Sequence, residues 1–542
     1  MKIALAQLNY HIGNFESNTK KIVDAIHQAK LQGAEIVLFS ELAVCGYPPR
    51  DFLEFEDFIQ KCEHAIDEIK IHTAGIAVLV GSPSRNPKIE GKDLFNSAYF
   101  IADGEVKKII HKTLLPTYDV FDENRYFEPN NSFEIIEYKG KKIAVTICED
   151  LWNLGNNNPL YTICPMDELM KFKPEMIFNL SASPFDYEHA EDRKRVLKAN
   201  AEAYQIPIYY CNQVGAQTEI IFDGGSLVID AKGNVVEELT YFNEEVKVIS
   251  NSSLVISENK IINHQSQIIN ALVLGIKDYF EKMNFKKAIL GLSGGVDSAL
   301  VLYLAAQALG KENVHSLLLP SEYSTSHSIS DAELLCKNLG TSYDIVPIKN
   351  NYETFLKTLN PYFKDLPFNV AEENLQARTR GVLLMAFSNK FGYILLNTTN
   401  KSEAAVGYGT LYGDMCGGIA VLGDVYKTQV YELCNFINRN EEIIPQNILT
   451  KAPSAELRPN QKDSDSLPEY DVLDKLLFQY IEKRQGPKEL IAQGFATDLV
   501  NRVLKMVNSN EWKRHQSAPI LRISKKAFGV GRRMPIVGKY LS

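Results

Sequence analysis

The sequence of 542 residues lacks the features that mark several specialised classes of protein. Its eight cysteines include no Cys-x-x-Cys pair, so neither a zinc site nor a disulfide framework is indicated. No uninterrupted apolar stretch approaches the length of a membrane span, and the first residues show no signal-peptide pattern. Internal repeats and low-complexity tracts are also missing. These absences predict an ordinary globular protein that works in the cytoplasm.

Composition and charge exclude further classes only weakly. The formal net charge of −9 at pH 7 argues against nucleic acid as the main partner, although it leaves room for a local basic pocket. Hydrophobic residues make up 45% and charged residues 23%, as in most soluble globular proteins. A chain of this length exceeds what one core usually holds, so we expect two or three domains.

Two stretches of alternating strand-like and helix-like patterns divide the chain. The first covers 1–250 and opens with the alternating run Lys2–Leu8. The polar stretch Tyr241–Asn263 is typical of a domain junction, and we place a linker at 251–263. The second stretch, 264–542, predicts a doubly wound parallel sheet, in which ligands bind at the carboxyl ends of the strands. Both halves are therefore expected to be of the α/β class.

A glycine-rich segment in the second half is the most informative motif of the chain. It consists of Gly291, Leu292, Ser293, Gly294, Gly295, Val296, Asp297 and Ser298. It lies between an apolar strand pattern and a helical pattern, where backbone N–H groups and a helix N-terminus converge on a phosphate. Asp297 is a candidate magnesium ligand, or else only the cap of a helix that begins near Ser298.

This octet differs from a Walker A loop because no Lys-Ser or Lys-Thr follows at the required spacing. It resembles the pyrophosphate loop of the ATP pyrophosphatases, which adenylylate a substrate and release pyrophosphate. The alternative is an ordinary glycine-rich turn between strand and helix. The resemblance implies that all eight residues bind ATP.

Three separated residues in the first half are candidates for nucleophilic catalysis. Cys148 ends an apolar strand pattern, Glu41 closes another, and Lys112 opens Lys-Thr-Leu-Leu-Pro-Thr-Tyr. Singly, they are explained as a buried thiol, a surface cap and a solvated charge. Together, in this order and with their flanking residues, they resemble the nitrilase (carbon–nitrogen hydrolase) superfamily. That resemblance implies an α-β-β-α sandwich over roughly residues 1–250.

The nitrilase resemblance also implies roles. A thiol is mostly protonated near its free pKa, so it needs a base. Glu41 would accept the thiol proton, Cys148 would attack a carboxamide carbon and release ammonia, and Lys112 would stabilise the oxyanion. Four further residues would bind glutamine: Tyr118, Glu123, Ser183 and His189. Relatives usually carry a Gly-Lys pair where this chain has Glu188-His189, so His189 replaces that lysine or glutamine is held differently.

The second half resembles the NAD synthetases. The matching segments include Glu373-Asn-Leu-Gln-Ala-Arg-Thr-Arg-Gly, Leu396-Asn-Thr-Thr-Asn-Lys-Ser-Glu and Tyr408-Gly-Thr-Leu-Tyr-Gly-Asp. Familiar relatives have glycine at Thr399. The resemblance implies that Thr398 contacts ATP and that Asp297 and Glu403 hold Mg²⁺. Four residues would bind deamido-NAD: Asn374, Arg378, Glu403 and Lys513.

The C-terminal tail is basic. After Glu511 there is no acidic residue, and eight lysines and arginines follow, among them Lys513 and Arg514. An otherwise acidic protein that binds ATP and a dinucleotide has to gather positive charge somewhere. The alternative is a solvated surface.

An amidase fused to an adenylylating domain implies a glutamine-dependent ligase. ATP would adenylylate deamido-NAD, and ammonia from glutamine would convert the adenylate to NAD, with AMP, pyrophosphate and glutamate as the other products. We expect the ammonia to pass through an internal channel, because ammonium is a poor nucleophile and the adenylate hydrolyses in water. The resemblance further implies a homo-oligomer, at least a dimer through the second domain, with small-molecule substrates and neither nucleic acid nor membrane as partner.

Three alternatives remain open at this point. Another glutamine-dependent ligase, making GMP or asparagine, would need a different glutaminase; an asparagine synthetase has cysteine directly after Met1, where this chain has Lys2. In the second alternative, the first half is a non-catalytic regulatory module and free ammonia is the nitrogen donor. In the third, the whole chain is a non-enzymatic nucleotide sensor. The presence of Glu41, Lys112 and Cys148 together argues against the last two.

Overall fold

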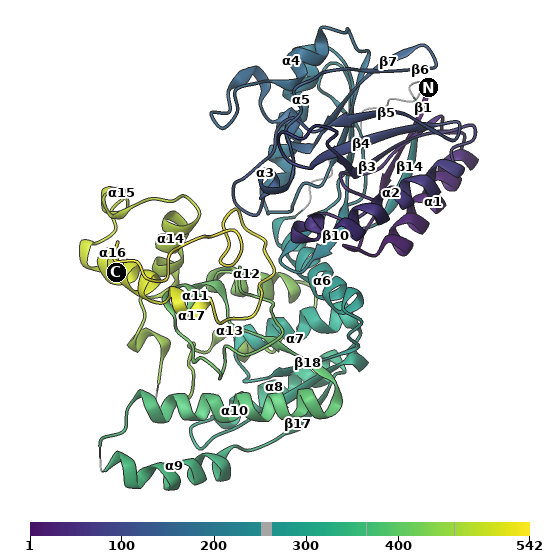
Figure 1. Cartoon of the computed structure of the whole chain (residues 1–542). Coiled ribbons are helices and arrows are strands. Elements are labelled where there is room, and N and C mark those ends of the chain that lie inside the picture. The colour runs from purple at the N-terminus through teal and green to yellow at the C-terminus, as the bar shows by residue number, and fades with distance from the viewer. Residues whose placement is uncertain (251–262, 365, 460, 542) are drawn as a thin grey trace. The chain divides into compact units, whose positions relative to one another are not determined.

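The computed structural model describes residues 1–250, 263–364, 366–459 and 461–541. The chain divides into two compact units, Met1–Ile262 and Asn263–Ser542 (Figure 1). Most of the linker predicted at 251–263 lies outside the described residues. Its last residue, Asn263, caps a helix of the second unit by accepting a hydrogen bond from the backbone N–H of Ser266. Among the described helices, none combines the length and the apolarity needed to cross a membrane.

The first unit is built on two six-stranded sheets. One has the order β14-β1-β2-β3-β4-β5, with β14 Glu245–Ser250, β1 Lys2–Gln7, β2 Ile36–Leu38, β3 Ala77–Arg85, β4 Leu94–Ala102 and β5 Glu105–His111. The other has the order β13-β12-β9-β8-β7-β6, with β13 Val235–Glu238, β12 Leu227–Ile229, β9 Ile208–Asn212, β8 Met176–Ser181, β7 Lys141–Ile147 and β6 Ile136–Tyr138. A short pair, β10 Val214–Gln217 and β11 Ile220–Asp223, is separate.

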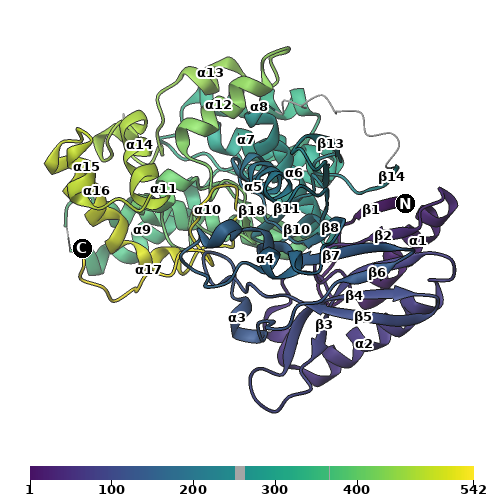
Figure 2. The same ribbon diagram turned by 90° about the horizontal axis from the view of Figure 1, so that it is seen from above.

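Helices cover the outer face of each sheet. The helices of this unit are α1 Phe15–Leu31, α2 Glu56–Ile71, α3 Glu123–Tyr126, α4 Pro165–Met170 and α5 His189–Tyr204. Side chains alternate along each strand, so Ile3 and Leu5 of β1 join the core between the sheets, whereas Ala4 and Ala6 face α1 and α2. The unit is therefore the α-β-β-α sandwich that the nitrilase resemblance implied (Figure 2).

The prediction that the polar stretch Tyr241–Asn263 is a domain junction is partly wrong. Glu245–Ser250 forms β14, which pairs antiparallel with β1 along the edge of the first sheet. Strand β14 has a half-buried pattern with charged residues, as sheet edges often do, and that composition resembles a linker.

The second unit contains a five-stranded sheet in which every described pairing is parallel. Its order is β17 Ser342–Ile345, β16 Val314–Leu318, β15 Lys287–Gly291, β18 Tyr393–Asn397 and β19 Ile419–Ala420. The chain runs outward from β15 to β17 and then returns to the other side at β18. The carboxyl ends of β15 and β18 therefore flank the switch point, where a doubly wound sheet binds its ligands.

Helices pack on both faces of this sheet, as predicted. The longer helices are α6 His264–Lys282, α7 Val296–Leu309, α8 Ser326–Leu339, α9 Lys349–Phe363, α10 Val370–Phe391 and α12 Lys427–Ile437. A smaller helical layer with its own core is formed by α11 Lys401–Val406, α14 Tyr470–Ile481, α15 Pro487–Ala492, α16 Thr497–Ser509 and α17 Glu511–Arg514. The remaining short helix is α13 Gln446–Thr450.

Candidate active sites

In the first unit, the predicted catalytic residues come from strand ends of both sheets. Glu41 lies in the turn after β2, and Lys112 directly follows β5 in the same sheet. Cys148 directly follows β7 of the facing sheet. The sandwich thus brings together three residues separated by up to 107 positions, since 148 − 41 = 107.

A buried group of charges lies at this meeting point. The Lys112 ammonium donates to Glu41 at 2.6 Å and to Glu123 at 2.8 Å, and Asn96 donates to Glu41 at 2.7 Å. Burial alone would lower the pKa of Lys112, but the charges of Glu123 and Glu41 outweigh it and hold that pKa well above its ordinary value. Burial, with the Glu41 charge adding to it against Lys112, raises the pKa of Glu123 to about 7. The group carries one carboxylate more than Lys112 neutralises.

The backbone of Cys148 has the strained conformation often found at functional residues. Its φ is 43°, in the left-handed region that L-residues other than glycine rarely adopt. The side chain is buried, and the Ser181 hydroxyl lies 3.1 Å from the sulfur. Burial raises the pKa of the Cys148 thiol and the Glu41 charge raises it further, while Lys112 and the Ser181 hydrogen bond lower it. The thiol therefore needs the surrounding donors to become a nucleophile.

Glu149, the next residue, carries a second buried carboxylate. It accepts hydrogen bonds from the Tyr118 hydroxyl at 3.0 Å and the Tyr161 hydroxyl at 2.8 Å. Burial raises its pKa. Tyr118 was predicted from the sequence, whereas Glu149 and Tyr161 were not. The carboxylate of Glu123, which is predicted to bind glutamine, accepts hydrogen bonds from Lys112, Tyr47 and Asn96.

The two remaining residues predicted for glutamine lie next to each other. The Ser183 hydroxyl is 2.8 Å from Nε2 of His189, at the start of α5. The His189 ring stacks on Trp152, with ring centroids 5.3 Å apart and planes at 10°. His189 is thus held by an aromatic face and a hydroxyl.

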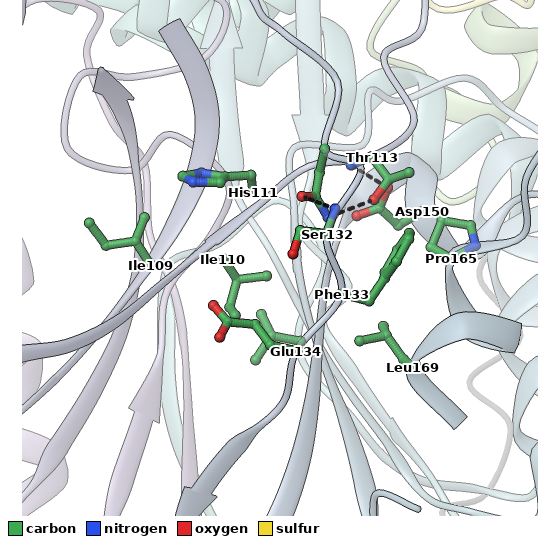
Figure 3. Close-up of a pocket in the computed structure, with 12 residues that line it drawn as sticks. Ile109, Ile110, His111, Thr113, Ser132, Phe133, Glu134, Asp150, Pro165 and Leu169 are labelled. Carbon is green, nitrogen blue, oxygen red and sulfur yellow. Dashed lines mark hydrogen bonds between the residues drawn. The ribbon is translucent and has the colours of Figure 1, made fainter. Parts of the chain in front are cut away.

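A cavity of about 210 Å³ is lined by residues that include His111 and Thr113, the two neighbours of Lys112 in the chain. Figure 3 shows Thr113 and Asp150 at one end, with Phe133 and Leu169 on its apolar wall. The Asp150 carboxylate accepts from the backbone N–H groups of Thr113, Leu114 and Ile147 at 2.8–3.0 Å. It therefore joins the segment after Lys112 to the strand that ends at Cys148.

In the second unit, the glycine-rich octet forms the predicted turn between β15 and α7. Gly294 has φ +77°, and a Cβ there would meet the Ser328 carbonyl oxygen at 2.2 Å, so only glycine fits. Ser293 and Ser298 lie with their hydroxyls 3.2 Å apart inside the turn. Helix α7 begins at Val296 with Gly295 as its cap, so the alternative that Asp297 caps the helix is wrong.

Asp297 meets Glu403 and Lys427 at the switch point of the sheet. Lys427 forms an ion pair with Asp297 and lies 3.6 Å from Glu403, and Asn400 donates to Asp297 at 2.9 Å. Burial and then the Asp297 charge raise the pKa of Glu403 to about 8. Within the part of the chain that the structure describes, no group of three or more His, Cys, Asp or Glu side chains is placed to hold a metal ion.

The other predicted ligands lie near this group or around the loop after α11. Thr398 directly follows β18, and the backbone N–H of Thr399 donates to Asn397, so the residue that replaces glycine fits this turn. Three predicted deamido-NAD ligands contact the loop at 407–411. Thr410 donates to Asn374 at 2.7 Å, Arg378 donates to the Leu411 carbonyl, and Lys513 donates to the Gly407 and Gly409 carbonyls.

Part of the basic tail serves the fold. Arg514 and Arg532 both pair with Glu511, at 2.7 and 2.6 Å, and Arg514 also donates to the Ala404 and Ala405 carbonyls at the end of α11. The side chains of these two arginines are buried, and their charges are paired with Glu511 inside the protein. Among the basic residues of the tail, Lys513 is the one that the sequence predicts as a ligand of deamido-NAD.

Several residues of these groups were not predicted as ligands from the sequence: Asn96, Glu149, Tyr210, Asn400 and Lys427. Glu149 and Asn400 are adjacent to predicted residues or within quoted motifs, so attention to neighbours would have found them. Asn96, Tyr210 and Lys427 have only strand or helix patterns around them, and nothing local distinguishes them.

Comparison with known proteins is consistent across sequence and structure. Residues 2–253 match the carbon-nitrogen hydrolase family, and residues 268–517 match the NAD synthase family. The chain is 47% identical to the glutamine-dependent NAD(+) synthetase of Synechocystis sp. over 98% of each chain, and 40% identical to that of Thermotoga maritima over 100% of this chain and 99% of the relative. A solved structure of the glutamine-dependent NAD(+) synthetase from Acinetobacter baumannii, in complex with ADP, is 38% identical with a TM-score of 0.79, covering 99% of this chain and 98% of that one.

Proposed function

This chain belongs to the family of glutamine-dependent NAD(+) synthetases, and we propose how its residues share the reaction. It is a ligase that uses ATP and glutamine to convert deamido-NAD to NAD, with a glutaminase domain and an NAD synthase domain. The observation that carries our assignment is that each unit holds its own charge group, one around Cys148 and one around Asp297.

We assign amide hydrolysis to the group around Cys148. Glu41 takes the thiol proton, the sulfur attacks the carboxamide carbon of glutamine, and ammonia leaves with a thioester behind it. Lys112 stabilises the oxyanion, and its preorganised charge supports this role because it lies in a site shielded from water. Water activated by Glu41 then releases glutamate. Glu123 balances the charge of Lys112 rather than contacting glutamine directly.

Glutamine recognition is assigned to two groups of opposite character. Glu149, with Tyr118 and Tyr161 on its oxygens, would accept the α-amino group of glutamine, because a buried carboxylate needs a cationic partner. Ser183 and His189 would bind the α-carboxylate. Support for His189 comes from its stacking on Trp152 and its hydrogen bond with Ser183, which hold the ring in place.

We assign adenylylation to the turn of residues 291–298 together with Thr398. Its backbone N–H groups and the N-terminus of α7 favour phosphate binding. Deamido-NAD would lie along the loop at 407–411, between Asn374, Arg378 and Lys513, with Glu403 nearby in sequence. Lys427 would add a charge close to the ATP phosphates, since it already lies between Asp297 and Glu403.

Magnesium fits the residues present. Asp297 and Glu403 place two partly buried carboxylates around one lysine, and burial together with the Asp297 charge raises the pKa of Glu403 to about 8. Mg²⁺ is commonly bound by one or two carboxylates plus substrate phosphates and water, so a larger protein ligand set is not required. When bound, the ion would neutralise charge on the ATP phosphates. Asp297 and Glu403 would hold it.

We further propose that the enzyme is at least a dimer through the second unit. Helices α9 and α10 pack against each other and expose large apolar side chains, including Phe355, Tyr362, Val382 and Phe391. Exposed apolar groups of this size commonly mark interfaces. Val382→Glu should lower the sedimentation coefficient, whereas Val472→Glu on α14 should not. Use of ATP and glutamine also favours the cytoplasm as its location.

The division of labour is tested by Cys148→Ala. We expect loss of glutaminase activity and of glutamine-driven NAD formation, with ammonia-driven synthesis near the wild-type rate. Cys62→Ala, which removes another buried thiol of the same unit, is the matched control and should keep both activities. Loss of the ammonia-driven reaction in folded Cys148→Ala would contradict the assignment, as would retained glutamine-driven synthesis.

A further inference from the structure

A chain of two hydroxyl groups ends at the sulfur of Cys148. The Ser181 hydroxyl donates to the Cys148 sulfur at 3.1 Å, and the Tyr210 hydroxyl donates to Ser181 Oγ at 2.9 Å. None of the roles assigned above uses Ser181 or Tyr210. Both side chains are buried, at 1% and 3% exposure, so water does not compete for these hydrogen bonds.

The sheet itself aligns this chain of hydroxyls. Strands β7, β8 and β9 are parallel neighbours, with Ile147 opposite Leu180 and Asn179 opposite Tyr210. Cys148 and Ser181 therefore lie at adjacent strand ends. Ser181 and Tyr210 are held by the sheet itself, and Cys148 is the first residue after its neighbouring strand β7.

Tyr210 is the first donor of the chain of hydroxyls, and this sets the direction of both hydrogen bonds. Burial raises the pKa of the Tyr210 phenol, so it keeps its proton and acts as a donor. The Arg193 guanidinium lies 5.8 Å from the centre of the Tyr210 ring and pairs with Asp223 at 2.9 Å, so Tyr210 rests against a fixed, buried cation. With its oxygen accepting from Tyr210, Ser181 has its single hydroxyl proton available for the sulfur.

Donors aligned in one direction polarise each other, and they favour a charged acceptor more than a neutral one. The sulfur of Cys148 is charged at two moments: after its proton has moved to Glu41 and before it attacks the carboxamide, and again when water expels it from the thioester. In the thioester the sulfur is neutral. The Ser181 hydroxyl stays intact throughout and only strengthens its hydrogen bond when the sulfur is charged.

We propose that Ser181 and Tyr210 form a hydroxyl relay that stabilises the Cys148 thiolate, with Ser181 touching the reacting atom and Tyr210 acting as a positioning residue through Ser181. This inference rests on the proposed role of Cys148 as the nucleophile. It assigns a role to two uncharged residues, neither of which belongs to the set of Glu41, Lys112 and Cys148.

The test measures how alkylation of Cys148 by iodoacetamide depends on pH, in the full chain without glutamine. Only the thiolate reacts, and mass spectrometry of the Cys148 peptide separates it from the other seven cysteines. Ser181→Ala should move the midpoint of alkylation upward by about one to two pH units, and glutaminase kcat near neutral pH should fall roughly tenfold or more. Tyr210→Phe should move it in the same direction by less.

The proposed relay also predicts how the Ser181→Ala/Tyr210→Phe double variant behaves. In the Ser181→Ala background, Tyr210→Phe should cause no additional shift, because Tyr210 acts only through Ser181. Tyr209→Phe removes a buried hydroxyl from the same strand and should leave the midpoint in place. Urea unfolding followed by Trp152 fluorescence in a Trp512→Phe background reports that the first unit of each variant is folded.

Two results would overturn the relay: an unchanged midpoint in Ser181→Ala, or an undiminished Tyr210→Phe shift in the Ser181→Ala background. Neither would affect the assignment of Cys148. That assignment would fail separately if complete alkylation of Cys148 in the wild-type enzyme left glutamine-driven synthesis intact. The two failures are therefore distinguishable in one set of samples.

Discussion

Replacing Lys112 by methionine tests how the charge group around the nucleophile holds together. Lys112 is fully buried and its ammonium lies 2.6 Å from Glu41 and 2.8 Å from Glu123. Without it, two buried carboxylates face each other with no cation. Removing one partner of a buried ion pair typically costs about 3–5 kcal/mol, so we expect Lys112→Met to lower the free energy of unfolding of the first unit by that amount. Glutaminase activity should be lost as well.

Glu123→Gln is the informative companion. The pKa of Glu123 is raised to about 7, chiefly by burial, so its neutral form is already populated near neutral pH. Because this pKa lies above the ordinary value of 4.5, the stability it contributes is complete below about 4.5 and is lost as pH rises through about 7. Glu123→Gln should abolish this pH dependence and cost about 1 kcal/mol or less. Lys112→Met/Glu123→Gln should be more stable than Lys112→Met alone by about 0.5–3 kcal/mol.

The two tryptophans of the chain, Trp152 and Trp512, lie one in each unit, which makes the measurement possible. In a Trp512→Phe background, urea unfolding followed by Trp152 fluorescence reports the first unit. Matched unfolding midpoints for Lys112→Met and the parent would refute the charge argument. So would a double variant whose loss equals the sum of the two single losses.

Three further predictions concern the other groups. Asp297→Ala should still hydrolyse glutamine but release no pyrophosphate from ATP and deamido-NAD; a folded variant that releases pyrophosphate at the wild-type rate would remove Asp297 from the site. His189→Ala should raise KM for glutamine roughly tenfold or more, and His189→Lys should restore it, whereas equal KM values in all three proteins would show that glutamine is held without this residue. Because burial and the Asp297 charge raise the pKa of Glu403 to about 8, magnesium should bind with proton release below that pH and more tightly above it; titration calorimetry giving the same heat in buffers of different ionisation enthalpy would contradict this.

Much of the fold and of the chemistry could be predicted from local patterns. The turn formed by residues 291–298 could be predicted from those eight residues, because the turn, the glycine conformation and the helix N-terminus are all local features. The segments around Glu41, Lys112 and Cys148 likewise carry their identity in their own flanking residues. Strand and helix alternation predicted the parallel sheet of the second unit, and the nitrilase resemblance implied the sandwich of the first.

The errors arose where the local pattern and the tertiary role diverge. Glu245–Ser250 resembles a linker because an edge strand exposes one side to water, and only its pairing with β1 makes it part of the first unit. For Asp297 the sequence left a helix cap open as the alternative, and the structure excludes it because the helix begins one residue earlier and the carboxylate pairs with Lys427, which is 130 positions away.

By itself, then, the sequence determined which residue types are present at each strand end and which family of chemistry they suit. Only the tertiary structure decided which side chains form ion pairs and hydrogen bonds with one another. These partners are set by the distances between strand ends that lie far apart in the chain. Glu123 became a partner of Lys112, and Ser181 and Tyr210 became neighbours of Cys148, through the closure of two sheets. Those partnerships depend on burial, since a charge or a hydroxyl in water would have solvent in place of a partner.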